Sequence, residues 1–129
     1  MIRLLSAGMA LAVTGLLVTP MAQAKDDDRR EVEISGSCSK SARWDLKAKE
    51  RDGRTEIEFE VDSGRRGQRW SYTVTQNGTR VMSGKKRTRG SSGSFSVERY
   101  GRPAVGSQTI TGRAQNRRSG EICLGTLRL

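Results

Sequence analysis

The strongest constraint on the fold lies between Arg43 and Asp62, which read RWDLKAKERDGRTEIEFEVD. Two alternating runs flank the dipeptide Asp52-Gly53, whose residues both tolerate the positive φ angles of a two-residue type I′ turn. If the chain folds back there, paired residue numbers sum to 105 and the large apolar side chains share one face. A shift of one residue would turn that face to water, so the register is strongly specified. The stretch predicts an antiparallel β-hairpin.

The two faces of this predicted hairpin differ in chemistry. Its apolar face comprises three cross-strand pairs, Trp44–Val61, Leu46–Phe59 and Ala48–Ile57. Its polar face sets Lys49 opposite Glu56 and Lys47 opposite Glu58, which predicts cross-strand ion pairs. General acid–base catalysis needs a carboxylate whose surroundings raise its pKa, whereas these carboxylates face solvent beside lysines. We interpret them as structural, and a hydrolase that uses Glu58 or Glu60 is the least favoured alternative.

A second hairpin is predicted at Asn77-Gly78, another dipeptide typical of type I′ turns. The preceding run, residues 69–76, alternates apolar and polar side chains. Paired numbers about this turn sum to 155, which predicts that Val74 lies opposite Val81.

A third hairpin is predicted at the end of the sequence, about the polar turn NRRSGE. Residues 107–116 and the final run then pair with numbers that sum to 237. This register sets Ala114 opposite Cys123 with both facing the core, and it leaves Ile122 and Leu124 on the outer face.

Two further strands are expected over residues 31–37 and from Phe95 to near Tyr100, followed by a loop over residues 101–106. No helical period appears after the first 24 residues. About 7–8 short strands joined by hairpin turns predict an all-β, antiparallel, immunoglobulin-like β-sandwich.

The beginning of the sequence has the features of an export signal. An early cation precedes an apolar run, and Ala-Gln-Ala at 22–24 is a typical cleavage motif. The run is shorter than the ~20 residues that a membrane span needs, which disfavours the alternative of an anchor. We expect a secreted protein without a transmembrane segment in its mature chain, divided into a signal peptide (1–24), a flexible charged arm (25–30) and one β-sandwich domain (31–129).

The two cysteines, Cys38 and Cys123, both follow the expected leader. An even number in an exported chain favours a disulfide, with two buried free thiols as the alternative. Such a cross-link is worth roughly 4–5 kcal/mol for a loop of this length. That contribution matters because Leu, Ile, Val and Phe account for only 16 of the 105 residues after the leader.

Charge is distributed unevenly along this basic chain. Residues 25–62 carry a net charge of −3, whereas residues 63–129 carry +12. Such an excess indicates an anionic partner, although a basic surface that only aids solubility is the competing interpretation. The candidate anion-binding residues are Arg65, Arg66, Arg69, Lys85, Lys86, Arg87, Arg89, Arg117 and Arg118.

The residue types disfavour most catalytic chemistry. The chain has no histidine, which excludes Ser-His-Asp and Cys-His catalysis and the usual zinc sites. Asp62, Gly64, Arg66 and Gly67 have the spacing of a calcium loop, but two arginines there oppose a dication. We therefore expect no enzyme activity, no metal and no cofactor.

Nucleic-acid binding by base readout is also disfavoured. The aromatic residues are needed for the core, and only Tyr100 is expected to be free for stacking. Salt-sensitive contact with a nucleic-acid backbone stays open, whereas sequence-specific binding does not.

The segments WDLKAKERDG, EFEVD, GQRW, SGSF and GEICLGTLRL together resemble small exported β-sandwich proteins of actinobacteria. The resemblance covers nearly all of the chain after the leader. It implies an immunoglobulin-like or fibronectin-III-like fold and an exported location, and it implies no activity.

Two hypotheses of function follow. The first is a secreted, non-enzymatic protein whose basic side binds an anionic polymer or the cell envelope by electrostatic attraction. The second is a protein-binding module, an inhibitor or effector, that uses loops 63–69 and 84–94 together with Ile122 and Leu124.

Overall fold

The computed structural model describes Gly15, residues 30–103 and residues 105–129. The expected signal peptide and charged arm lie outside these residues, apart from Gly15 and Arg30. The described part of the chain forms β1 (Glu31–Ser37), β2 (Arg43–Arg51), β3 (Arg54–Asp62), β4 (Arg69–Gln76), β5 (Thr79–Arg87), β6 (Ser94–Pro103), β7 (Thr109–Asn116) and β8 (Ile122–Arg128).

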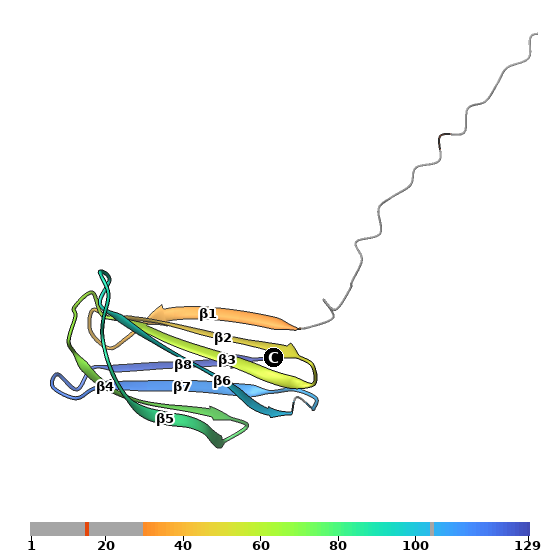
Figure 1. Ribbon diagram of the computed structural model, residues 1–129. Helices are drawn as coiled ribbons and strands as arrows, with labels where there is room; N and C mark the ends of the chain where they lie inside the picture. The colour runs from red at the N-terminus through yellow and green to blue at the C-terminus, as the bar shows by residue number, and fades with distance from the viewer. Residues whose placement is uncertain (1–14, 16–29, 104) are drawn as a thin grey trace, which may run out of the picture.

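The strands form two four-stranded antiparallel sheets that pack face to face (Figure 1). One sheet has the order β1-β2-β3-β6 and the other has the order β5-β4-β7-β8. Counted from β2, these orders match strands A-B-E and C′-C-F-G of an immunoglobulin-like sandwich, and β1 adds an edge strand. The predicted all-β sandwich is therefore confirmed.

The β2–β3 hairpin has the predicted register along its whole length, from Arg43 opposite Asp62 to Arg51 opposite Arg54. Asp52 and Gly53 have φ angles of 53° and 75°, as a type I′ turn requires. The cross-strand ion pairs are confirmed only in part. Lys49 Nζ lies 3.8 Å from Glu56, but Lys47 pairs with Glu31 of β1 at 3.3 Å instead of Glu58.

Glycines make room for the two largest rings of the β2–β3 hairpin. The indole of Trp44 lies between Gly36 of β1 and Gly125 of β8, and a Cβ at either position would overlap the ring. Phe59 lies in the same way against Gly112 of β7. The sheets can approach closely here because the opposing residues have no side chains.

The predicted register of the second hairpin is wrong beyond its first pairs. Asn77 and Gly78 form the expected turn, with φ angles of 51° and 81°. The register then shifts between Val74 and Thr75, so Val74 lies opposite Met82 and not opposite Val81. This β-bulge turns the Met82 side chain into the core, where it is 6% exposed.

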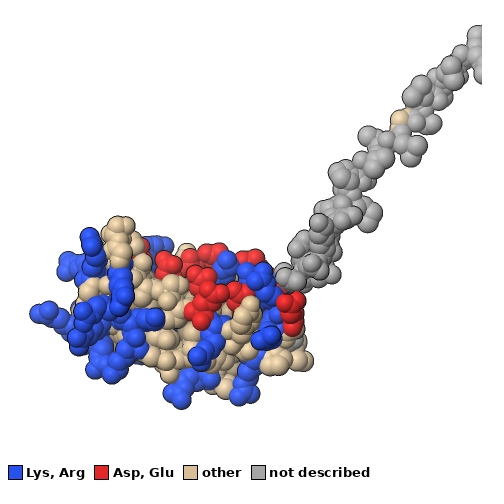
Figure 2. All heavy atoms as spheres, in the orientation of Figure 1, with Lys and Arg blue, Asp and Glu red and all other residues tan. Residues whose placement is uncertain are grey.

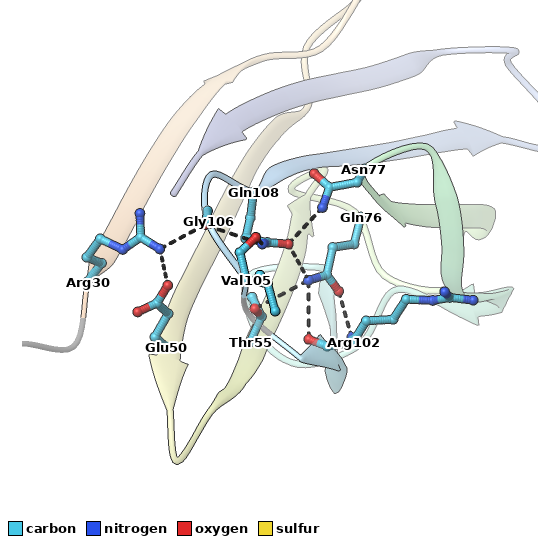
Figure 3. Close-up of polar contacts among 9 residues, drawn as sticks. All are labelled: Arg30, Glu50, Thr55, Gln76, Asn77, Arg102, Val105, Gly106 and Gln108. Atoms are coloured by element: carbon cyan, nitrogen blue, oxygen red, sulfur yellow. Dashed lines mark hydrogen bonds and ion pairs between the residues drawn. The ribbon is translucent and has the colours of Figure 1, made fainter.

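The loop predicted over residues 101–106 is also partly wrong, because β6 extends to Pro103. A second bulge lies there, since Glu56 pairs with Tyr100 whereas Arg54 pairs with Pro103. Buried amides support this end of the strand (Figure 3). Gln76 accepts a hydrogen bond from the backbone N–H of Arg102 (2.7 Å) and donates one to Gln108 (2.8 Å).

The disulfide between Cys38 and Cys123 is confirmed, and its cysteines are 85 residues apart. It links the β1–β2 connection of one sheet to β8 of the other, where β1 and β8 lie in contact. Beside it, the buried carboxylate of Glu121 accepts hydrogen bonds from the backbone N–H groups of Lys40 and Ala42, each at 2.9 Å. The connection is therefore fixed by both covalent and polar contacts.

Removal of this disulfide should lower stability strongly. We expect the Cys38→Ala/Cys123→Ala double variant to lose roughly 4–5 kcal/mol of unfolding free energy, because the bond closes a long loop. Urea unfolding followed by tryptophan fluorescence measures the loss. Reduction of the unmodified protein should reproduce it, and a loss below about 1 kcal/mol would contradict the estimate.

Filling the space beside Trp44 should also destabilise the fold. We expect Gly125→Ala to cost about 1–3 kcal/mol, because the added methyl group overlaps the indole. Thr126→Ala on the exposed face of the same strand is the matched control and should cost much less. In the Trp44→Phe background the smaller ring should reduce the cost of Gly125→Ala. Thermal unfolding of the unmodified protein, the two single variants at Trp44 and Gly125, and their double variant measures this coupling.

Candidate anion-binding surface

Most of the predicted cations converge at one end of the sandwich. Two adjoining hollows share Arg69 and Arg117 as lining residues, and the larger has a volume of about 1060 Å³. Figure 2 shows Lys and Arg side chains gathered at this end. We define the basic cluster as the eight cations that line the two hollows, Arg65, Arg66, Arg69, Lys85, Lys86, Arg87, Arg117 and Arg118.

The loop that carries Arg65 and Arg66 is held by the buried side chain of Thr88. The Thr88 hydroxyl donates a hydrogen bond to the Arg65 carbonyl at 2.5 Å and accepts one from the Gln68 N–H at 2.9 Å. The backbone of Thr88 adds hydrogen bonds with Gly67 and Gln68. Because Thr88 is only 1% exposed, these bonds are shielded from water and fix the loop.

The turn between β7 and β8 is ordered by Asn116. The Asn116 side-chain oxygen accepts hydrogen bonds from the backbone N–H groups of Arg118 and Ser119, at 2.9 Å and 3.0 Å. The N–H of Arg117 donates to the carbonyl of Arg69 at 2.9 Å, which ties this turn to the start of β4. Arginines distant in sequence are thus brought together by short backbone contacts.

Strand β5 adds the remaining cations of the cluster from the edge of its sheet. Arg87 pairs with Arg69 across the β4–β5 ladder, and Lys86 pairs with Trp70. Like charges directly opposite each other destabilise a sheet, so an anion near Arg69 and Arg87 would relieve their repulsion. Lysines on an edge strand also block pairing with another sheet.

The basic cluster has no internal neutralisation. Among residues 30–103 and 105–129, no ion pair includes any of its members. Glu121, the acid next to the β7–β8 turn in sequence, is buried and directed toward the backbone of Lys40 and Ala42. The acids of the described residues therefore leave the charge of the basic cluster unpaired.

The carboxylates gather on the outer face of the β1-β2-β3-β6 sheet (Figure 2). A small hollow there is lined by Glu33, Asp45, Lys47, Glu58 and Glu60. A hydrogen bond with Asp45 and the repulsion of its charge raise the pKa of Glu33 above its usual value. The residues that line this acidic hollow are different from those that line the two basic hollows.

A contact between Glu98 and Glu56 has opposite effects on the two carboxyls of that face. The hydrogen bond raises the pKa of Glu98, and the charge of Glu56 adds to the rise. The same hydrogen bond lowers the pKa of Glu56, with Lys49 and Arg51 contributing.

The other predicted contact residues, Arg89, Ile122 and Leu124, do not line the two basic hollows. Arg89 does not line either hollow and forms an isolated bridge with Ser94. Ile122 and Leu124 lie on the outer face of β8, and Leu124 is 57% exposed. The candidate loop 84–94 begins within strand β5, which includes Lys85, Lys86 and Arg87.

Sequence reasoning missed the two residues that order the cluster, Thr88 and Asn116. Each follows or ends a strand next to a basic run, and short polar side chains at such positions commonly bond nearby backbone groups. That signal was present for Asn116, which begins the turn NRRSGE. The contacts of Thr88 with loop 63–69 join distant segments, so no local pattern indicates them.

Comparison of the chain with protein-family models, with curated proteins and with solved structures returned no significant match. Within the described residues, no helix is long and apolar enough to span a membrane. The same residues contain no group of three or more acidic or cysteine side chains placed to hold a metal ion.

Loss of the Thr88 hydroxyl should loosen the basic cluster. We expect Thr88→Val to lower the unfolding free energy by about 1–3 kcal/mol, because the Arg65 carbonyl and the Gln68 N–H lose a buried partner. Thr88→Ser keeps the hydroxyl and is the control. Amide hydrogen exchange should accelerate across residues 65–68 in the valine variant alone, and unchanged exchange there would contradict this role.

Proposed function

We propose that this protein is a non-enzymatic binder that holds an extended anionic polymer through the basic cluster. One observation carries the proposal. Eight cations, none of them in an ion pair with another described residue, converge on two adjoining hollows at one end of the sandwich. Scattered cations would have favoured a role in solubility alone. The alternative assignment as a hydrolase has no support from the placement of Glu58 and Glu60 on the separate acidic face.

The shape of the cluster favours a polymer over a single small anion. The two hollows share Arg69 and Arg117 but have different lining on either side, so one phosphate or carboxylate reaches only part of the cluster. Arginine supplies six of the eight cations, and its planar fork of N–H donors matches phosphate, sulfate and carboxylate groups. A chain of such groups could occupy both hollows at once.

We place this binding outside the cytoplasm. The disulfide is compatible with an extracellular protein, and the sequence features of an export signal support the same location. An anionic polymer of the cell envelope is therefore the partner class that we favour. The competing function, a protein-binding module, would use loops 63–69 and 84–94 together with Ile122 and the exposed Leu124.

Neutralising the two shared arginines should abolish most of the binding. We expect Arg69→Gln/Arg117→Gln to weaken binding to long-chain polyphosphate at least 10-fold at low salt, because both hollows lose cations. Arg113→Gln/Arg128→Gln removes the same charge from exposed positions outside the cluster and should cost under 3-fold. Fluorescence anisotropy with labelled polyphosphate measures both effects.

Salt and chain length provide the decisive controls for this assay. Binding should fall steeply between 50 and 200 mM salt and should strengthen from short to long polyphosphate chains. Equal losses in the two double variants would refute the role of the cluster. Salt-resistant capture of a protein by both variants would support the protein-binding module instead.

A further inference from the structure

The far end of the β4–β5 hairpin carries a second hollow that the proposed function does not use. Its lining comprises Arg80, Val81, Arg99, Tyr100, Gly101 and Arg102, and its volume is about 540 Å³. Arg80 lies beside the Asn77-Gly78 turn, at the opposite end of β4 from Arg69. This hollow is therefore separate from the basic cluster.

Tyr100 gives this hollow an accessible aromatic surface. Its side chain belongs to a residue that is 46% exposed, whereas Trp70, Phe59 and Phe95 are buried. The guanidinium of Arg54 lies over the Tyr100 ring at 5.1 Å from its centroid, and this cation–π contact helps to orient the ring. Arg54 occupies one face of the ring, and because the residue is 46% exposed, part of the ring stays accessible to solvent.

The backbone that follows Tyr100 is fixed from inside the sandwich, where Figure 3 shows Gln76 in contact with Arg102. Gln76, which is 1% exposed, binds both the N–H and the carbonyl of Arg102, at 2.7 Å and 3.3 Å. Gly101 lies against the side chain of Gln76, so closely that a Cβ would overlap it. The bulge that follows Tyr100 is thus held by buried contacts, and β-bulges are common next to functional sites.

The chemistry of the lining selects an anionic ligand that accepts hydrogen bonds. Arg80, Arg99 and Arg102 offer only N–H donors, and the lining contains no carboxylate or amide side chain to accept bonds from sugar hydroxyls. Arg99 also lies near the adjacent strand, with its Nη1 3.5 Å from the Val81 carbonyl. A neutral saccharide would leave these charges uncompensated, whereas phosphate would satisfy them.

We infer that Tyr100, Arg80, Arg99 and Arg102 form a binding site for a nucleotide unit of single-stranded nucleic acid. The base stacks on the Tyr100 ring, and the arginines bind the adjoining phosphates. Stacking accepts every base because each has a π face, so the site discriminates single strands from duplexes and not one sequence from another. The site is independent of the proposed function.

The test uses a 5′-fluorescein-labelled thymidine trinucleotide and an abasic trinucleotide of the same charge, with anisotropy as the readout. The full chain carries Arg69→Gln/Arg117→Gln throughout, which removes binding by the basic cluster. In this background we expect Tyr100→Ala to weaken binding of the thymidine probe about 10-fold, and Tyr100→Phe to leave it within 2-fold. The abasic probe should bind at least 10-fold more weakly than thymidine and should not respond to Tyr100→Ala.

Substitution of an arginine should change the salt dependence of binding, which substitution of Tyr100 should not. Arg102→Gln should lower the slope of log affinity against log salt by about 0.7 if it binds one phosphate, whereas Tyr100→Ala should leave that slope unchanged. Thermal unfolding confirms that the variants are folded. Equal affinity for the abasic and thymidine probes, or an unchanged affinity in Tyr100→Ala, would overturn the inference even if the basic cluster binds polyphosphate as proposed.

Discussion

The packing of the Trp44 indole between Gly36 and Gly125 constrains how closely the two sheets can approach. It joins β1, β2 and β8, so a single ring bridges both sheets beside the disulfide. A chain with few large aliphatic residues cannot fill a wide space between two sheets. The sheets must therefore pack closely around the aromatic side chains. The glycines permit that approach, and the disulfide adds a covalent tie where the two edge strands meet.

The fold was largely predictable because short local sequence patterns determine its hairpins. Asp52-Gly53 and Asn77-Gly78 define their turns, and the alternation around them selects the buried face. The two bulges were not predictable from turn chemistry alone. The first depends on whether Val81 or Met82 fills the core, and the second depends on Gln76 reaching Arg102 from another strand. Such choices are decided by contacts between sheets, which a single strand pattern does not contain.

The candidate cations were predictable as a set, but their arrangement was not. Charge counting identifies Arg65, Lys85 and Arg117 equally well whether they meet or scatter. Their convergence follows from topology, because the β3–β4 loop, the end of β5 and the β7–β8 turn all lie at one end. The buried hydroxyl of Thr88 could not be identified by counting charges, because it is uncharged, and yet it fixes the position of the β3–β4 loop. Charge counting also selected Arg89, the next residue in the sequence, although Arg89 lines neither hollow.

The separation of charge gives the molecule a permanent electric moment. The carboxylates crowd on the outer face of one sheet while the basic cluster occupies an end of the sandwich (Figure 2). Near a negatively charged wall, such a particle rotates before it touches, with its cationic end leading. Once such a molecule is bound by this end, its acidic sheet face lies beside the contact, where neighbouring molecules would meet glutamates and aspartates.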